Sequence, residues 1–296
     1  MLPFELQGMK PEEFRARRPI AQRLVPAFKL VTPLDAARWM LATQAQQYDS
    51  GVKALQARAN ADNFDGIVRC WSQRGTHHFL AAEDAPWMMR SCAPRAEAAA
   101  AKRRPGLGIT SSDYARAKAA FHEALSSGPV PRKLAYEIMG FDGAQGSHLL
   151  RSFGSTGDVV QIDKDVFAFS GPGLDLEGDD ALAELGTRYF HSRGPATVQD
   201  LAWWSGLTVR DAKRAASLAR DVIQVGEHCM GAYQENVSLD GVLGNQLDLP
   251  AFDEYLLGYK DRSVVCPAEL VPIVGPTKNG MCRPFRVVDG EVAVVG

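Results

Sequence analysis

The pair Gln44 and Gln46, with only Ala45 between them, has the residue type and spacing of side chains that can do chemistry. Residues two apart in an extended loop project to the same side, and each glutamine offers a carbonyl acceptor and an amide donor. Such a pair can hold a water molecule or a polar group by hydrogen bonds. On the pattern alone, a polar loop whose glutamines contact only water remains the simpler interpretation.

The sequence holds no other motif typical of a catalytic or metal site. His77 and His78 are adjacent, so a strand would point them to opposite faces, and His228-Cys229 has no partner pair at the spacing of metal ligands. We therefore expect no metal. Because G-x-S-x-G, Walker and G-x-G-x-x-G patterns are all missing, a hydrolase triad and a nucleotide cofactor have no support, and we expect no cofactor.

The composition is that of a globular chain with sizeable hydrophobic cores. Of 296 residues, 46% are hydrophobic and 23% are charged, which excludes disordered, collagen-like and disulfide-framework proteins. The cysteines are odd in number, far apart and never in a C-x-x-C pair, so we expect reduced thiols in the core. The N-terminal stretch mixes acids with bases, and no run of eighteen apolar residues occurs. We expect a soluble, cytoplasmic protein with no membrane segment.

Charge is segregated along the chain although the net charge is only -2. Residues 1–156 carry 21 Lys and Arg against 14 Asp and Glu, and residues 157–296 carry 12 against 21. Within the second half, residues 157–184 hold eight acids and one lysine, whereas residues 185–220 hold six bases and two acids. A near-neutral total therefore does not exclude DNA binding by a basic surface, and ordinary patchiness of surface charge is the alternative.

Helical spacing and turn residues predict three passes of short helices followed by strands. The predicted elements are helices 33–42, 52–59 and 64–72 with strand 77–80; helices 111–125, 132–139 and 143–153 with a hairpin over 159–169 turning at Asp163-Lys164; and helices 180–193, 197–205 and 208–219 with a strand-like stretch 221–234. This order is typical of the winged helix. We expect a mainly α fold with small β wings (α+β): three tandem winged-helix (helix-turn-helix) domains at 1–104, 105–170 and 171–296.

The third pass carries the pattern expected of a DNA-reading helix. Thr197 and Thr208 are placed to begin two helices separated by Gly206, as a helix-turn-helix requires. On the second helix, positions 210, 213 and 214 share one face. The bases there are Arg210, Lys213 and Arg214. Repetition of the architecture favours DNA contact over the alternative, an ordinary solvated helix face.

Several stretches resemble a known family. They are Thr43-Gln44-Ala45-Gln46, RCWSQRGTHHFLAAEDAPWM from Arg69, RYFHSRGPATVQDLAWWSGL from Arg188, LPAFDEYLLGYKDRS from Leu249 and NGMCRPFRVVDGEV from Asn279. Together they resemble the winged-helix DNA glycosylases of the AlkZ/YcaQ type, in the family's order over most of the chain. The resemblance implies three tandem winged helices in a C-shaped arrangement around duplex DNA.

The resemblance also implies a reaction. Gln44-Ala45-Gln46 is similar to the family's Gln-apolar-Gln motif, which serves hydrolysis of the N-glycosidic bond of N7-alkylated purines. An alkylated purine is a cation and a good leaving group, so two amides that position a water and stabilise oxocarbenium charge suffice. We expect Gln46 to orient the water and Gln44 to contact the sugar-phosphate or the lesion. No lysine matches the motif, so the enzyme is expected to be monofunctional.

DNA contacts near the catalytic loop are a further implication of the resemblance. The segment Arg74-Gly75-Thr76-His77-His78 is expected to approach DNA, with Arg69, Arg74 and His78 as phosphate ligands. Packing of His77 or His78 beneath the sheet is the alternative. The stretch Pro250–Tyr255 is expected to be mainly architectural, with acids that bond backbone.

The partner implied is double-stranded DNA with an alkylated purine, an adduct or an interstrand crosslink, bound by a monomer. Thr43 stands where the family commonly has an apolar residue, and the sequence stops at Val295-Gly296, short of the family's usual end, so final elements are expected to be missing. The alternative function is a winged-helix DNA-binding protein without catalysis, either a regulator or a decayed glycosylase.

Overall fold

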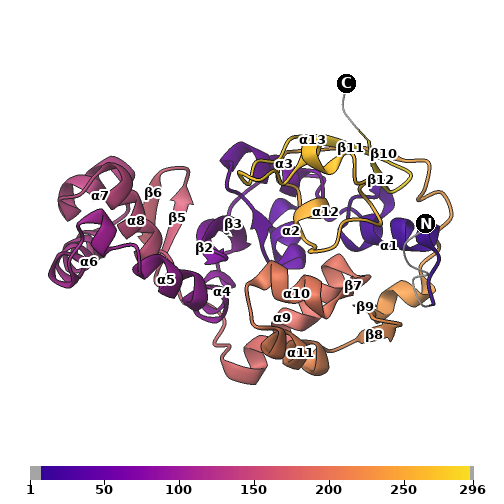
Figure 1. Cartoon of the computed structure of the whole chain (residues 1–296), viewed down its shortest axis with the longest axis horizontal. Coiled ribbons are helices and arrows are strands. Elements are labelled where there is room, and N and C mark those ends of the chain that lie inside the picture. Colours follow the sequence, from indigo (N-terminus) through magenta and orange to yellow (C-terminus); the bar gives the residue numbers. More distant parts are fainter. Residues whose placement is uncertain (1–7, 294–296) are drawn as a thin grey trace. The chain divides into compact units, whose positions relative to one another are not determined.

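The structure, a computed structural model, describes residues 8–293, and these form two compact units. The first unit combines the described residues up to Asp65 with those from Gly178 onward, and the second spans Gly66–Glu177. The fold is a mixture of helices and strands (Figure 1). Three tandem winged helices and the boundaries 1–104, 105–170 and 171–296 stay predictions, and Val295-Gly296 lies outside the described residues.

The helices of the first unit come from both of its chain segments. They are α1 (Pro11–Ala21), η1 (Pro26–Phe28), α2 (Pro33–Met40), α3 (Tyr48–Gln56), α9 (Gly178–Arg193), α10 (Val198–Ser205), α11 (Val209–Leu218), η3 (Ala232–Asn236), α12 (Glu254–Leu257) and α13 (Val271–Val274). Helix α9 is the central one, since it packs against α1, α2, α11 and strand β9 (His228–Gly231) (Figure 1). At Gly186 a Cβ would lie 2.4 Å from the Ala215 carbonyl oxygen, so glycine permits the close approach of α9 and α11.

The strands of the first unit are short. They are β1 (Thr43–Gln44), β7 (Ala196–Thr197), β8 (Val222–Val225), β9 (His228–Gly231), β10 (Gln246–Leu249), β11 (Phe285–Val288) and β12 (Glu291–Ala293). Antiparallel pairing gives one sheet in the order β7-β9-β8 and another in the order β10-β11-β12. Leu249, Phe285 and Val287 of the second sheet belong to a hydrophobic core with Tyr255 and Leu256 of α12. This packing holds α12 against the sheet.

The predicted helix-turn-helix residues have the expected local roles. The Thr197 side chain accepts from the Asp200 N–H in a capping box, and Thr208 accepts from the Asp211 N–H. Gly206 ends α10 in the left-handed conformation, with φ 77°. The predictions of helices 197–205 and 208–219 are thus confirmed to within one residue at each end.

The second unit is built around two β-hairpins. Its elements are β2 (Ile67–Gln73), β3 (Thr76–Ala81), α4 (Ala85–Cys92), α5 (Pro94–Ala101), η2 (Pro105–Leu107), α6 (Ser111–Ser126), β4 (Val130–Pro131), α7 (Arg132–Met139), α8 (Gly143–Phe153), β5 (Val159–Asp163) and β6 (Val166–Phe169). Within the unit the strand order is β3-β2-β5-β6-β4, and the paired strands are antiparallel. Phe121, Phe153 and Phe167 are fully buried in the core between helices and sheet. Burial of each such side chain contributes about 1.5–3 kcal/mol.

Several local predictions are wrong. The helix predicted over 33–42 ends at Met40, because Leu41 leaves the helical conformation with a positive φ of 61°. Residues 64–72, predicted as a helix, hold strand β2, because a short run with Ile67, Val68 and Trp71 does not separate helix from strand by periodicity and its branched and aromatic side chains favour a sheet. The helix predicted over 52–59 begins earlier, as α3. The β5–β6 hairpin turns one residue later than predicted, since Asp163 pairs with Val166.

Candidate active site

The turn that leads from α2 into the glutamine loop has a strained backbone. Leu41 has φ 61° and ψ -52°. The Ala42 N–H donates to the Met40 carbonyl at 2.7 Å. These values define a γ-turn with positive φ, a rare conformation for a residue with a bulky side chain. Leu41 is fully buried, so the surrounding structure holds this conformation in place.

The two glutamines lie in different surroundings. Gln44 ends strand β1 and is only 7% exposed, whereas Gln46 follows Ala45 in a bend and is exposed. The strand ends before Gln46, so the rule that residues two apart share a face does not govern the pair. The Gln44 Oε1 atom is buried and has no hydrogen-bond partner among the described residues. It is a buried acceptor that these residues leave unsatisfied.

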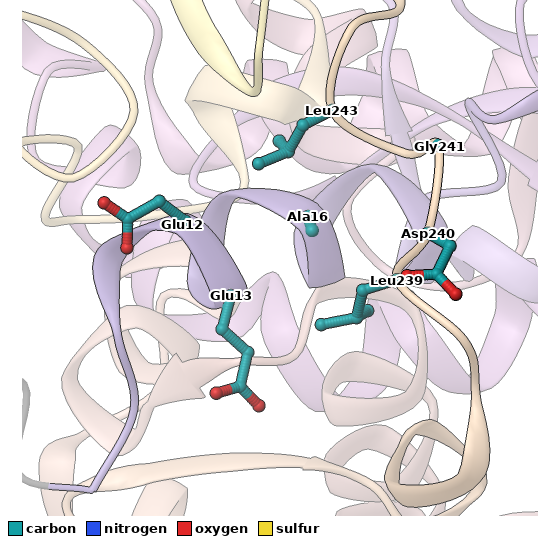
Figure 2. A pocket seen from close by; sticks show the side chains of 7 residues that line it. All are labelled: Glu12, Glu13, Ala16, Leu239, Asp240, Gly241 and Leu243. Carbon is teal, nitrogen blue, oxygen red and sulfur yellow. The ribbon is translucent and has the colours of Figure 1, made fainter.

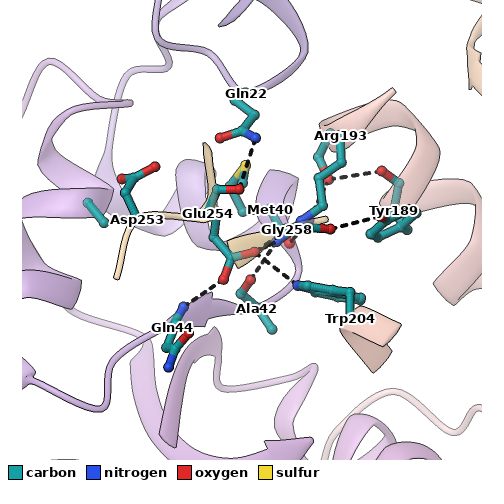
Figure 3. A network of polar contacts seen from close by, with 12 residues as sticks. Gln22, Met40, Ala42, Gln44, Tyr189, Arg193, Trp204, Asp253, Glu254 and Gly258 are labelled. Carbon is teal, nitrogen blue, oxygen red and sulfur yellow. Dashed lines mark hydrogen bonds and ion pairs between the residues drawn. The ribbon is translucent and has the colours of Figure 1, made fainter. Parts of the chain in front are cut away.

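Glu254, the first residue of α12, is attached to the loop by a hydrogen bond. The Gln44 N–H donates to Glu254 Oε1 at 3.0 Å. The other carboxylate oxygen, Oε2, accepts from Trp204 Nε1 at 2.9 Å and from Arg193 Nη2 at 2.7 Å. Figure 3 shows these donors converging on the carboxylate. Since the Glu254 side chain is 0% exposed and both of its oxygens accept hydrogen bonds, its role is structural.

Arg193, the last residue of α9, contacts the strained turn on both sides. Its Nη1 donates to the Met40 carbonyl at 2.8 Å and its Nη2 to the Ala42 carbonyl at 2.7 Å. The remaining donors go to Ser192 Oγ and to Glu254 Oε2. Every N–H of the guanidinium is therefore used, and the side chain is 0% exposed.

A second buried ion pair lies beside the first. Arg58 and Asp253 form two hydrogen bonds of 2.9 and 2.8 Å, and both side chains are 0% exposed. Asp253 also accepts from the Tyr255 N–H at 2.8 Å and so caps α12. The expectation that the acids of Pro250–Tyr255 are architectural and bond backbone is confirmed, because Asp253 bonds the N–H of Tyr255 and Glu254 that of Gln44.

Sequence reasoning missed the roles of Arg193 and Glu254. Arg193 lies about 150 positions from the turn it contacts, and Glu254 lies 210 positions from Gln44. The only signal in the sequence was the presence of both residues in stretches that carried the family resemblance.

In the second unit, three of the predicted DNA-binding residues lie close together and are buried. Arg69 donates to Gln161 Oε1 at 2.7 Å. The His77 ring packs against Trp71 with ring centroids 4.0 Å apart. Burial, together with Arg69, Arg132 and His78, lowers the pKa of His77 to about 2. His77 is therefore neutral at neutral pH. The fully buried His78 has its Nδ1 3.0 Å from the Thr76 carbonyl. Packing of both histidines, the alternative left open above, is what the structure shows.

Arg74 occupies the turn between β2 and β3. Arg74 and Gly75 have φ of 53° and 72°, as a two-residue hairpin turn requires. A Cβ at Gly75 would lie 3.6 Å from the Arg151 guanidinium, which places a second arginine beside the turn. Arg74, Gly75 and Thr76 are half-buried.

The predicted DNA-reading residues of α11 are exposed. Arg210, Lys213 and Arg214 lie on the outer face of the helix. Arg214 forms two hydrogen bonds with Asp179 of α9, whereas Arg210 has a longer contact of 3.4 Å with Asp211. DNA binding by α11 and by the residues of the second unit stays a prediction.

Comparison with known proteins decides the family. A family model described as "DNA glycosylase AlkZ-like" matches residues 31–295. The chain belongs to the AlkZ-like DNA glycosylase family. Among solved structures, the Streptomyces sahachiroi DNA glycosylase AlkZ is similar with a TM-score of 0.73 and 18% sequence identity, over 96% of this chain and 87% of that chain. No curated protein sequence matches the chain.

Membership of this family implies a DNA substrate. One surface cavity of the first unit has a lining that does not suit DNA. That cavity, of about 420 Å³, is lined by residues of α1 and of the loop after η3 (Figure 2). Glu12, Glu13 and Asp240 face it, and carboxylates repel the phosphates of DNA. It contains none of the residues predicted to act in this AlkZ-like protein.

Other features of this AlkZ-like chain concern its cysteines, metals and membranes. All of its cysteines are buried and unpaired, and burial raises the pKa of the Cys70 and Cys92 thiols to about 12. The described residues contain no group of His, Cys, Asp and Glu side chains placed to hold a metal ion. Among the same residues, no helix has the length and apolar character needed to span a membrane.

Proposed function

We propose that this AlkZ-like glycosylase hydrolyses the N-glycosidic bond of cationic N7-alkylated purines in double-stranded DNA, as adducts or interstrand crosslinks. The observation that carries the proposal is the chemistry of the loop: it presents two amides, and the carboxylate bonded to it is unavailable. Glu254 is fully buried and both of its oxygens accept hydrogen bonds, so it neither donates a proton to a leaving base nor takes one from a water.

A cationic purine removes the need for a general acid. The water oxygen bonds to the sugar C1′ as the bond from C1′ to the purine nitrogen breaks, and the bond electrons neutralise the departing base. The proton of the water passes to solvent. The exposed Gln46 orients the water, and Gln44 contacts the sugar-phosphate or the lesion. Amide dipoles held in place stabilise the oxocarbenium charge without reorganisation.

We further propose that the protein is a cytoplasmic monomer made of three tandem winged helices at 1–104, 105–170 and 171–296. The support is the capped pair α10 and α11 followed by the hairpin β8–β9, the order of parts of a winged helix. Its proposed DNA contacts are Arg74 and Thr76 at the turn between β2 and β3, with Arg210, Lys213 and Arg214 of α11. Arg69, His77 and His78, predicted as further contacts, are buried and are not proposed again. Light scattering of the purified chain tests the monomer.

The experiment for the function is base release. Incubation with a duplex that contains one N7-methylguanine is expected to yield free N7-methylguanine and an abasic site, detected by chromatography and by cleavage in alkali. Borohydride is expected to trap no covalent enzyme–DNA complex, since a monofunctional enzyme forms no Schiff base. Binding to undamaged duplex without base release from any of a panel of alkylated DNAs would favour the non-catalytic alternative instead.

A further inference from the structure

We propose that Arg193 and Glu254 are positioning residues, which hold the Gln44–Gln46 loop in its reactive geometry by fixing the strained turn in front of it. Neither side chain touches solvent, so neither touches the substrate directly. The proposal rests on the proposed glycosylase function and assigns to it two residues far from the loop in the sequence.

The turn needs an external restraint. Leu41 has a positive φ of 61°, and such a conformation costs about 1–3 kcal/mol relative to an ordinary one. Its one internal hydrogen bond, from the Ala42 N–H to the Met40 carbonyl, spans three residues. Relaxation of Leu41 to negative φ would change the direction in which the chain leaves α2, and strand β1 with the glutamines follows directly. The position of the loop therefore depends on whatever holds this turn.

The Arg193 side chain has the geometry needed to hold this turn. Its two terminal nitrogens donate to the Met40 and Ala42 carbonyls, one on each side of Leu41. The guanidinium is planar and rigid, so it fixes the separation and orientation of both carbonyls at once. A lysine ammonium at the same position has a single nitrogen on a flexible stem and cannot reproduce this fork.

Glu254 extends the restraint to the catalytic residue itself. One carboxylate oxygen holds the Arg193 guanidinium, and the other accepts from the Gln44 N–H. A chain of contacts thus runs from the turn through Arg193 and Glu254 to Gln44. Replacing the carboxylate with an amide breaks this chain, because the NH₂ group of a glutamine must face either the Arg193 donors or the Gln44 N–H.

The neighbouring pair, Arg58 and Asp253, provides a control that distinguishes a positioning role from a general contribution to stability. It has the same chemistry and the same burial, and its acid comes from the adjacent residue. Apart from Asp253, the described partners of Arg58 are the Ala54 carbonyl and Gln22 Oε1, not residues 40–46. Arg58→Lys is therefore the matched control for Arg193→Lys.

The test compares wild type, Arg193→Lys, Glu254→Gln and Arg58→Lys by two measurements, at a temperature where each is folded. The first is amide hydrogen exchange, which needs no substrate. Exchange over residues 40–47 is expected to speed up in Arg193→Lys and Glu254→Gln relative to Arg58→Lys. The second is the base-release rate constant at saturating N7-methylguanine duplex. It is expected to fall about 100-fold in Arg193→Lys and Glu254→Gln. The DNA dissociation constant of both variants is expected to stay within about twofold of wild type.

The outcomes are separable. Equal exchange over residues 40–47 in Arg193→Lys and Arg58→Lys would overturn the positioning role, as would equal losses of rate. If exchange speeds up in the two variants but the wild type releases no base, the positioning role is supported and the proposed substrate is wrong. If Arg193→Lys does not fold, Trp204→Phe removes one hydrogen bond to Glu254 and is expected to speed exchange in the same segment.

Discussion

The Gln44 N–H donates to Glu254 Oε1 at 3.0 Å, although the two residues are 210 positions apart in the sequence. The bond is buried, and the same carboxylate holds the guanidinium that spans the γ-turn before the loop. A short loop with two uncharged amides is thereby attached to a charged and rigid part of the first unit. The proposed reaction depends on positioning rather than on acid–base groups, and this attachment fixes the position of the loop.

The Arg58–Asp253 pair is expected to be essential for stability. Asp253→Ala leaves the Arg58 charge buried and unpaired, which costs about 3–5 kcal/mol in free energy of unfolding. Urea denaturation followed by circular dichroism measures it. The control is Asp179→Ala, which breaks an exposed ion pair with Arg214. We expect no measurable change in the free energy of unfolding of this variant. Equal effects of the two substitutions would contradict the importance of burial.

Exposed bases on α11 are expected to make phosphate contacts. Lys213→Ala should weaken binding to any duplex and reduce the slope of log K against log salt concentration by about 0.9. Arg214→Ala should have a smaller effect, because Asp179 already pairs with this side chain. Fluorescence anisotropy over a salt series measures both. Arg286→Ala, in a pair with Asp248 on another element, is the control. An unchanged slope in Lys213→Ala would exclude that contact.

His77 is expected to make stability depend on pH. Its pKa is lowered to about 2 in the folded chain, mainly by burial, whereas an unfolded histidine titrates near 6.5. Below pH 6.5 the unfolded state therefore binds a proton that the folded state does not, and stability falls by about 1.4 kcal/mol per pH unit as the pH decreases. Above pH 6.5 His77 is neutral in both the folded and the unfolded chain, so it no longer makes the free energy of unfolding depend on pH.

The variant His77→Gln isolates that effect. Urea denaturation of both proteins between pH 7 and pH 5 is expected to show a shallower decline in the variant, since the glutamine does not titrate. Parallel declines would mean that His77 is protonated in the folded chain.

The cysteines are expected to be unreactive in the native protein. All of them are buried, and burial raises the pKa of Cys70 and Cys92 to about 12 and that of Cys266 and Cys282 to about 11. Reaction with Ellman's reagent should be negligible before denaturation and should report five free thiols afterwards. Fewer than five in the denatured chain would indicate a disulfide. Rapid reaction of the native chain would indicate local opening.

Local signals in the sequence predicted the helices well and the contacts between distant segments poorly. Helix α7 has the predicted bounds because Pro131 and Gly140 mark its two ends. Strand β2 was mistaken for a helix because its apolar run is too short for periodicity to decide. The candidate loop was singled out by the family resemblance of Gln44-Ala45-Gln46, and its catalytic role stays a prediction. Its restraint by Arg193 and Glu254 was not predicted, since a buried ion pair leaves no local pattern.

The measurement that tests the account most directly is single-turnover release of N7-methylguanine by wild type, Gln46→Ala and Gln47→Ala. Gln46 and Gln47 are exposed neighbours, and only Gln46 belongs to the proposed catalytic motif. Wild type and Gln47→Ala are expected to release the base at similar rates, whereas Gln46→Ala is expected to be about 100-fold slower, with unchanged DNA binding. Equal rates in all three proteins, or no release by wild type, would contradict the proposed function of the loop.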